Sequence, residues 1–94
     1  MPTFCMFGQY SRKGVREISA ERTAKAEAVL KDAGGEFKAG YALLGNTDLI
    51  LIADLPSVKE AMKASVELNK LLGIAFTTAP AVSVEEFDKL FEGG

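Results

Sequence analysis

Two spacings of hydrophobic and polar positions alternate along the chain. A segment in which every second side chain is apolar, or in which nearly all side chains are apolar, is typical of a strand. A segment in which apolar residues recur three and four positions apart is typical of a helix. The predicted order is strand, helix, strand, strand, helix, strand, and a short tail helix. The expected strands cover residues 3–9, 36–44, 48–53 and 74–82, and the expected helices cover residues 11–33, 57–72 and 84–91.

Local signals support these boundaries. Serines followed three residues later by glutamate form capping boxes at helix starts, and glycines supply the left-handed stops at helix ends. Ser19 can cap a new helix, so a break is expected there within the first helical region. The capping boxes are Ser57 with Glu60 and Ser83 with Glu86, and the stops are Gly34-Gly35 and Gly73.

The same spacing assigns the faces that each helix should bury. Cys5 lies in an apolar strand and is expected to be a buried, inert thiol. The expected stripes are Ala26, Val29, Leu30 and Ala33 in the first long helix, Val58, Ala61, Met62, Ser65, Leu68 and Leu72 in the second, and Val84, Phe87, Leu90 and Phe91 in the tail helix.

The middle strands are joined at Gly45-Asn46, which suits a tight primed hairpin turn. Two right-handed crossovers joined by a hairpin fold most simply as an α+β, ferredoxin-like βαββαβ antiparallel sheet with both long helices on one face. The first and third strands are then central, and the fourth, which contains Pro80, is an edge. Because the first and third strands are apolar on both faces, we predict a homodimer that packs sheet against sheet and buries about 1,600 Å² or more.

Composition narrows the class of protein. At 94 residues the chain has room for one domain, residues 1–94. Its 11 basic and 13 acidic residues are interspersed, so the basic footprint of a nucleic-acid-binding protein is missing. No run approaches the roughly 18 apolar residues that span a membrane, and no signal peptide is recognisable, so we expect a cytoplasmic protein. With no histidine and one cysteine, the usual zinc, haem and triad chemistries are lacking, and we expect no metal and no other cofactor.

One carboxylate, Asp48, directly precedes the apolar run 49–52. A charge beside so much hydrocarbon is either tied into a turn or used, because burying it unpaired is costly. In one interpretation Asp48 accepts backbone N–H groups of the hairpin. In the other it is an anchor or general base at the end of the sheet, together with Tyr41. The residues expected on the strand face of Tyr41 are Phe37, Ala39 and Leu43.

The second candidate site is the basic start of the first helix, where Arg12, Lys13 and Arg16 crowd together. The free N–H groups of a helix start attract phosphate or carboxylate, and cations add to that attraction. Tyr10 leads into this turn and would border a cleft there. The alternative is that the three cations are simply solvated and that Tyr10 is a packing residue.

Several segments together resemble one family. They are Met1-Pro2-Thr3-Phe4, Tyr10-Ser11 through Gly14-Val15-Arg16, Gly34-Gly35, the turn ending in Asp48, and Glu85-Glu86-Phe87. The chain is similar over essentially its whole length to the GYD domain, a family of small bacterial proteins. The resemblance implies a ferredoxin-like fold that dimerises into a dimeric α+β barrel, and it implies no established activity. The motif that names the family has glycine followed closely by tyrosine-aspartate; Gly45 and Asp48 match it, and Thr47 stands where the tyrosine is expected.

Three functions remain as hypotheses. The first is a homodimer that binds a small metabolite, with an anion as one option, in a cleft between sheet and helices. The second is a structural or regulatory self-association module without a ligand. The third is a cofactor-independent enzyme, similar to the small monooxygenases of this superfold, that uses Asp48 and Tyr41 in the same cleft. Whether the chain is an enzyme stays open at this stage.

Overall fold

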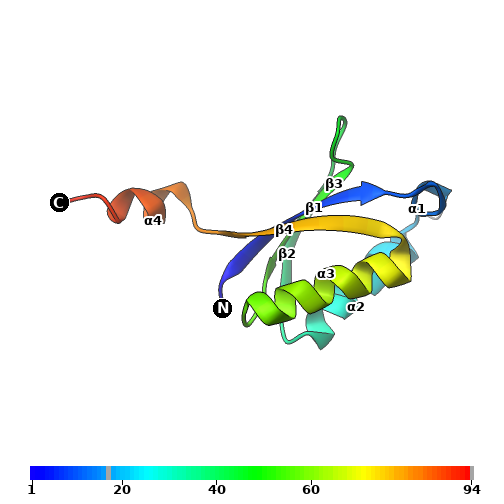
Figure 1. The fold of residues 1–94 in the computed structure, drawn as a ribbon, viewed down its shortest axis with the longest axis horizontal. Coiled ribbons are helices and arrows are strands. Elements are labelled where there is room, and N and C mark those ends of the chain that lie inside the picture. The colour runs from blue at the N-terminus through cyan, green and yellow to red at the C-terminus, as the bar shows by residue number, and fades with distance from the viewer. Residues whose placement is uncertain (17, 94) are drawn as a thin grey trace.

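The computed structural model describes residues 1–16 and 18–93, apart from the side chain of Lys13. Within these residues, four strands form one antiparallel sheet in the order β2-β3-β1-β4, and α2 and α3 cover one of its faces (Figure 1). The strands are β1 (Thr3–Tyr10), β2 (Glu36–Ala42), β3 (Leu49–Asp54) and β4 (Ile74–Ala81), and the helices are α1 (Arg12–Arg16), α2 (Ala20–Asp32), α3 (Val58–Leu72) and α4 (Val84–Lys89).

The strand order places β1 and β3 in the centre of the sheet and β4 at an edge, as the sequence predicts. β1 pairs with both neighbours, so that Phe4 lies opposite Ala53 on β3 and opposite Pro80 on β4. Proline has no backbone N–H to donate to a ladder, and an edge strand is where that loss is tolerated. The hydrophobic pattern therefore identifies the central strands correctly.

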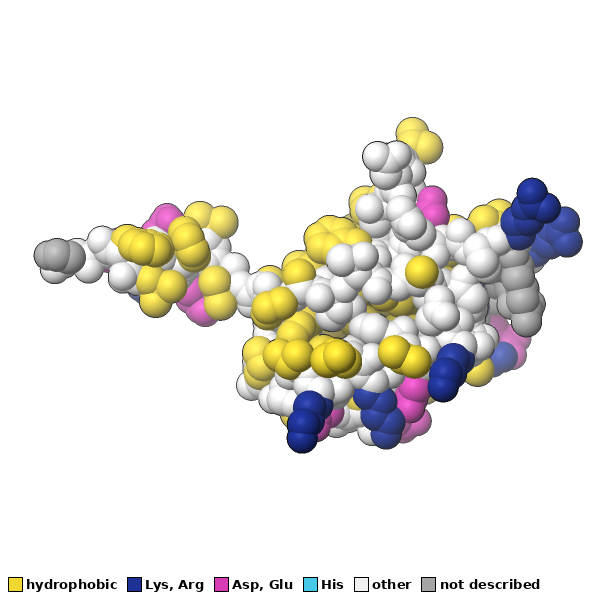
Figure 2. Space-filling model, viewed as in Figure 1, with side chains coloured by type: hydrophobic (Ala, Val, Ile, Leu, Met, Phe, Trp, Pro, Cys, Tyr) yellow, Lys and Arg dark blue, Asp and Glu magenta, His cyan; other side chains and the backbone are white. Residues whose placement is uncertain are grey.

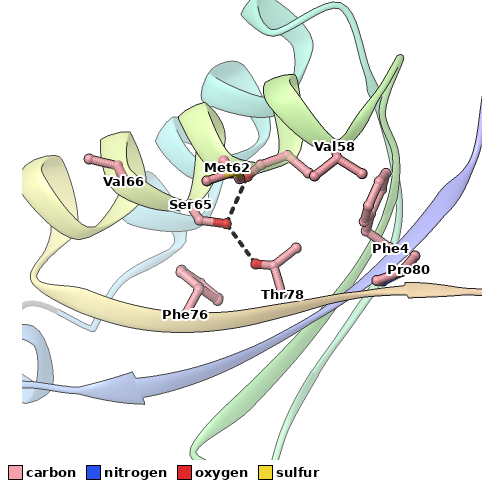
Figure 3. Close-up of a pocket in the computed structure, with 9 residues that line it drawn as sticks. Phe4, Val58, Met62, Ser65, Val66, Phe76, Thr78 and Pro80 are labelled. Atoms are coloured by element: carbon pink, nitrogen blue, oxygen red, sulfur yellow. Dashed lines mark hydrogen bonds between the residues drawn. The ribbon is translucent and has the colours of Figure 1, made fainter.

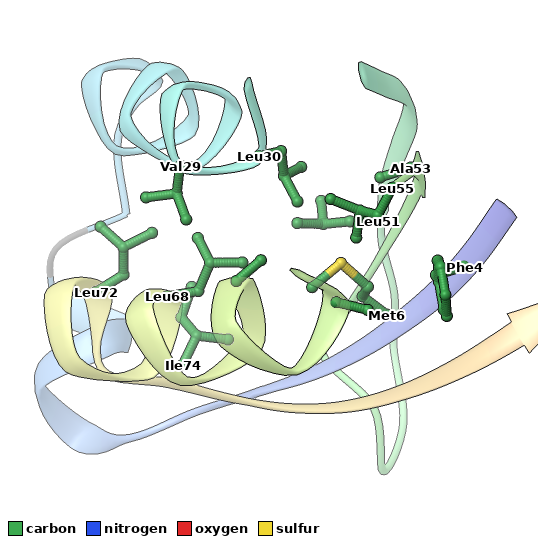
Figure 4. Close-up of a cluster of buried hydrophobic side chains, with 12 residues drawn as sticks. Phe4, Met6, Val29, Leu30, Leu51, Ala53, Leu55, Leu68, Leu72 and Ile74 are labelled. Carbon is green, nitrogen blue, oxygen red and sulfur yellow. The ribbon is translucent and has the colours of Figure 1, made fainter. Parts of the chain in front are cut away.

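The core fills the space between the sheet and the two long helices (Figure 4). Phe4 and Met6 of β1 belong to this core together with residues such as Leu30 of α2 and Leu68 of α3. Burying a side chain of this size contributes about 1.5–3 kcal/mol, so one apolar layer holds the helices on the sheet. The buried apolar residues are Phe4, Met6, Val29, Leu30, Leu51, Ala53, Leu55, Ala61, Ala64, Leu68, Leu72 and Ile74.

Helix boundaries follow the predicted caps. Ser19 breaks the first helical region, and its Oγ accepts the backbone N–H of Arg22 at 3.1 Å. Ser57 and Ser83 cap α3 and α4 in the same way, and Gly73 ends α3 in the left-handed conformation with φ of 67°. Ser19 thus begins α2 because its side chain accepts a hydrogen bond from one of the N–H groups that the start of a helix leaves unpaired.

The connection between β2 and β3 differs from the predicted tight turn. A primed turn places its first central residue near φ of about +60°, whereas Gly45 has φ of 138°. Instead, the N–H of Leu43 donates to the carbonyl of Asp48 at 2.8 Å and closes a wider loop. The side-chain amide of Gln9 donates to the carbonyl of Asn46 at 2.8 Å and ties this loop to β1.

A bulge in β2 changes which side chains share a face. The register shifts between Phe37 and Ala39, which leaves Lys38 as the extra residue. Phe37 consequently packs against the core, whereas Ala39 and Tyr41 lie on the opposite face of the sheet. The prediction that Tyr41 shares its face with Phe37 is therefore wrong, because strict alternation was assumed through the bulge.

That opposite face is uncovered by the described residues of the chain, and we call it the open face. Cys5 is half-buried there rather than fully buried, because only its neighbours in the sheet shield it. Phe7 and Tyr41 are 38% and 59% exposed. The apolar side chains on the open face include Cys5, Phe7, Ala39, Tyr41, Ile50, Ile52, Ala75 and Ala79, and the same face carries the polar side chains of Gln9 and Thr77.

The last helix, α4, follows the end of β4 and projects away from the sheet (Figure 1). None of its side chains is buried. In the part of the chain that the structure describes, no helix has the length and apolar character needed to cross a membrane.

Candidate functional site

A groove with a cavity volume of about 270 Å³ runs between α3 and the edge strand β4 (Figure 3). We call it the α3–β4 groove. None of the residues that line it is charged. They are Val58, Ala61, Met62, Ser65 and Val66 from α3, Phe76, Thr78 and Pro80 from β4, and Phe4 from β1.

One wall of the groove is a second apolar stripe on α3. Val58, Met62 and Val66 recur every four residues, so they lie above one another on the same side of the helix. The sequence predicts Val58 and Met62 to be buried, yet they are 58% and 65% exposed. The two predictions are wrong because the core side of α3 is instead the row that includes Ala64 and Leu68.

Two hydroxyl groups meet across the groove (Figure 3). Ser65 Oγ donates to the carbonyl of Ala61 at 2.8 Å and lies 2.6 Å from Thr78 Oγ1. A serine hydroxyl has one proton, so the proton shared between the two hydroxyls comes from Thr78. The oxygen of Thr78 then has lone pairs left to accept a hydrogen bond inside an otherwise apolar groove.

Asp48 is held by the backbone of β1. Its carboxylate oxygen Oδ2 accepts the N–H of Tyr10 at 2.8 Å, and its own N–H donates to the carbonyl of Gly8 at 2.9 Å. The carboxylate therefore accepts a backbone N–H, as the turn interpretation expects, but from the neighbouring strand rather than from the hairpin. This bond fastens the start of β3 to the end of β1.

The other predicted site residues are spread over two regions. Arg22 lies over the ring of Tyr10, with 4.8 Å between the guanidinium carbon and the ring centre, and Tyr10 also packs against the core. Arg12 and Arg16 follow in α1 and are exposed. The side chain of Lys13 lies outside the described residues. α1 itself is five residues long.

Tyr41 lies apart from these residues, on the open face opposite Ile50. None of the predicted site residues whose side chains the structure describes lines the α3–β4 groove. The signal that would have indicated the groove is the spacing of Val58, Met62 and Val66, which continues alongside the core stripe of α3.

A polar cluster borders one end of the open face. Thr3 Oγ1 donates to Asp54 Oδ1 at 2.6 Å, and Lys38 Nζ lies 3.4 Å from both Asp54 Oδ2 and Glu36 Oε2. The hydrogen bond from Thr3, with help from Lys38, holds the pKa of Asp54 below its usual value. The carboxylates of Glu36 and Asp54 in turn raise the pKa of Lys38.

The capping box of α3 is the other place where a pKa shifts. Ser57 donates its hydroxyl proton to the carboxylate of Glu60, and this bond lowers the pKa of Glu60. The shift has a structural cause, since the box closes the start of a helix. Among the described residues, no three potential ligands of histidine, cysteine, aspartate or glutamate type gather as a metal site would require.

Replacing Asp48 with asparagine is expected to lower the free energy of unfolding by about 1 kcal/mol. Asparagine keeps an acceptor for the N–H of Tyr10 but loses the charge, and charge-assisted hydrogen bonds are roughly twice as strong as neutral ones. Urea denaturation at one protein concentration measures the change. Asp32→Asn, an exposed carboxylate at the end of α2, is the control and should stay within about 0.5 kcal/mol. Equal stabilities of the two variants would contradict a structural role for the Asp48 carboxylate.

Comparisons with known proteins agree with this fold. The family model of the GYD domain matches residues 4–91. The crystal structure of the leucine response regulatory protein of Mycobacterium tuberculosis is similar with a TM-score of 0.58 and 8% identity, over 88% of this chain and 51% of that one. The chain thus spans about half the length of that regulator, and the likeness shows the fold alone. No protein of curated function matches the sequence. Because the family model covers nearly the whole sequence, this chain belongs to the GYD domain family.

Proposed function

We propose that this protein is a homodimer in which each copy binds a small, mainly apolar molecule in its α3–β4 groove. The strand order β2-β3-β1-β4 supports a ferredoxin-like domain over residues 1–94, and two such sheets packed face to face would form a dimeric α+β barrel. The observation that carries the binding proposal is the groove itself, a mainly apolar cavity lined by the hydroxyl groups of Ser65 and Thr78. Its volume of about 270 Å³ is close to the lower end of the roughly 300–1,000 Å³ typical of ligand sites.

The lining of the groove defines the chemistry of the ligand. Without a charged side chain in its walls, the groove offers nothing to neutralise a phosphate or carboxylate, so the anionic version of the hypothesis loses support. The free lone pairs of Thr78 favour a ligand with one hydroxyl or N–H donor.

The homodimer is supported by the open face. Its half-buried aliphatic side chains, such as Ile50 and Ile52, would lose the rest of their exposed surface against a second sheet. A second copy supplies a surface of the same composition and needs no other protein. This feature also favours the second candidate function, a self-association module without a ligand, and only a binding measurement separates the two.

Binding of N-phenyl-1-naphthylamine tests the proposal, because this neutral fluorescent molecule is apolar and has one N–H donor. Met62→Trp fills the groove from its exposed wall and is expected to weaken probe binding at least tenfold. Thr78→Val removes the acceptor and should weaken it roughly fivefold, the value of one hydrogen bond of about 1 kcal/mol. Leu71→Trp adds the same side chain to an exposed position of α3 outside the groove and should leave binding unchanged.

Native mass spectrometry of the purified protein gives the subunit count in the same series. A dimer that carries extra mass, lost on denaturation, would support both parts of the proposal. A dimer that retains no small molecule and does not bind the naphthylamine would favour the self-association module. Equal probe affinities of Met62→Trp and Leu71→Trp would place binding elsewhere and contradict the groove.

A further inference from the structure

The C-terminal helix α4 is locally well formed but uncovered. Ser83 Oγ accepts the N–H of Glu86 at 3.0 Å, and Lys89 pairs with Glu85 at 3.7 Å. The rings of Phe87 and Phe91 are 5.2 Å apart at their centres. A helix of six residues is far shorter than the roughly 12 to 15 at which isolated helices become even marginal in water, so α4 needs a surface to pack on.

The segment has a distinct surface of its own. Its apolar stripe is 51–75% exposed in every member, Val84, Phe87, Leu90 and Phe91. The residues 83–93 carry four acidic groups and one basic group, a net charge of −3. Asp88 and Glu92, four positions apart, lie beside the stripe. The surface that α4 fits is therefore apolar with basic side chains at its border.

Such a surface lies at the other end of the molecule. α1 and α4 are at opposite ends of the longest dimension, which measures 51 Å (Figure 1). Val15 of α1 and Ile18, two positions beyond the end of α1, are 52% and 60% exposed, and Arg12 and Arg16 of α1 are exposed as well. Figure 2 shows basic side chains gathered at the α1 end and acidic and hydrophobic ones on α4.

We propose that α4 of one copy packs on α1 and Ile18 of a second copy, with its apolar stripe on Val15 and Ile18 and its acidic border on Arg12 and Arg16. The inference rests on the proposed dimer and specifies its geometry. The chain's own α1 is out of reach of α4, since the two lie at opposite ends. A partner turned end to end brings its α1 beside α4.

Charge decides between the two ways of stacking the sheets. A two-fold axis along the strands would place the two acidic α4 segments together, and like charges in contact are unfavourable. An axis across the strands places each acidic α4 against a basic α1 of the partner. This second arrangement repeats the same favourable contact twice, as two-fold symmetry requires.

Two single-cysteine proteins test the geometry. In a Cys5→Ala background, one protein carries Val15→Cys and the other Leu90→Cys; both positions are exposed. The two proteins are mixed, allowed to exchange subunits and treated with a short bismaleimide. We expect a covalent dimer in the mixture and none in either protein alone.

Each other outcome overturns a defined statement. Cross-linking of Leu90→Cys with itself would show the axis along the strands and overturn the inference. A dimer by native mass spectrometry without mixed cross-links would overturn the α4 contact and leave the proposed dimer standing. A monomer would overturn both, and a ladder of higher oligomers would overturn the two-fold arrangement.

Charge reversal is a second measurement that does not depend on cysteine reactivity. Arg12→Glu with Arg16→Glu is expected to raise the dimer dissociation constant roughly tenfold at low salt, from exposed pairs of modest strength repeated by symmetry. Adding Asp88→Lys with Glu92→Lys should restore the dissociation constant of the parent protein. Lys59→Glu with Lys63→Glu makes the same change in charge in the first turns of α3 and should have little effect on the dissociation constant. Failure of the compensating pair to restore the dimer would contradict the contact.

Discussion

The Ile52→Lys variant is expected to be a folded monomer, with a dissociation constant raised about a thousandfold or more. Ile52 lies near the middle of the open face, between Cys5 of β1 and Ala39 of β2. In a face-to-face dimer each copy would bury this position, so two ammonium groups would be taken out of water. An uncompensated buried charge costs about 3–5 kcal/mol, and each 1.4 kcal/mol is a factor of ten.

The same substitution is mild within one chain. Ile52 is half-exposed in the single chain, so a lysine there can keep its charge in water and lay its methylene groups on the strand. The helix-facing side of β3 carries the buried Leu51 and Ala53, and these are left untouched. We therefore expect a normal circular dichroism spectrum and cooperative unfolding from the monomer.

Sedimentation equilibrium measures the dissociation constant, and Leu71→Lys is the matched control. Leu71 is 54% exposed on α3 and lies outside both the open face and the α3–β4 groove. The control should dimerise like the parent protein. If Ile52→Lys also stays dimeric, the open face is not the interface, and the dimer would have to form elsewhere.

Much of the fold follows from local signals in the sequence. Serine caps and glycine stops act within three or four residues, so Ser19, Ser57 and Gly73 fix helix ends that the sequence shows directly. Strand order follows from the apolar runs and from Pro80, because burial on both faces and the lack of a ladder donor are properties of single segments.

The candidate site depends instead on contacts between distant segments. Asp48 and Tyr10 are 38 residues apart, and the sequence contains no signal that joins a carboxylate to that particular N–H. The bulge at Lys38 reverses the faces of Phe37 and Tyr41, and no glycine or proline marks it. The α3–β4 groove exists because Met62 and its neighbours lie beside the core stripe of α3 rather than in it, a rotation of the helix that only packing decides.

The paired glycines after α2 also separate what a local signal predicts from what packing between distant segments decides. The sequence predicts Gly34-Gly35 as a helix stop, and Gly34 fulfils that role with φ of 85°. Gly35 does not have a positive φ, so its backbone conformation is open to other residues. What requires glycine at position 35 is space, since a Cβ atom there would lie 2.3 Å from the carbonyl oxygen of Asp54 and 2.5 Å from Leu55 Cδ2.

Gly35→Ala is accordingly expected to lower the free energy of unfolding by about 3 kcal/mol, at the upper end of the cost of overpacking. The carbonyl of Asp54 cannot retreat, because β3 is paired there with both Thr3 and Glu36, and the next N–H, of Leu55, donates to Pro2. α2 would have to move away from the sheet instead, and the contacts of Leu30 with the core would loosen.

Thermal denaturation at one protein concentration measures this cost, since 1 kcal/mol shifts the melting temperature by roughly 4–8 °C in a chain of this size. Gly45→Ala is the control: Gly45 has φ of 138° but open space where a Cβ would lie, so only backbone strain, of about 1–3 kcal/mol, is expected there. A larger loss at position 45 than at position 35 would mean that conformation, rather than the close approach of α2 to the end of β3, sets the demand for glycine. In that case the Asp54 carbonyl moves to make room for the Cβ atom. The end of the sheet beside the cluster of Thr3, Asp54 and Lys38 is then more easily deformed than its hydrogen bonds indicate.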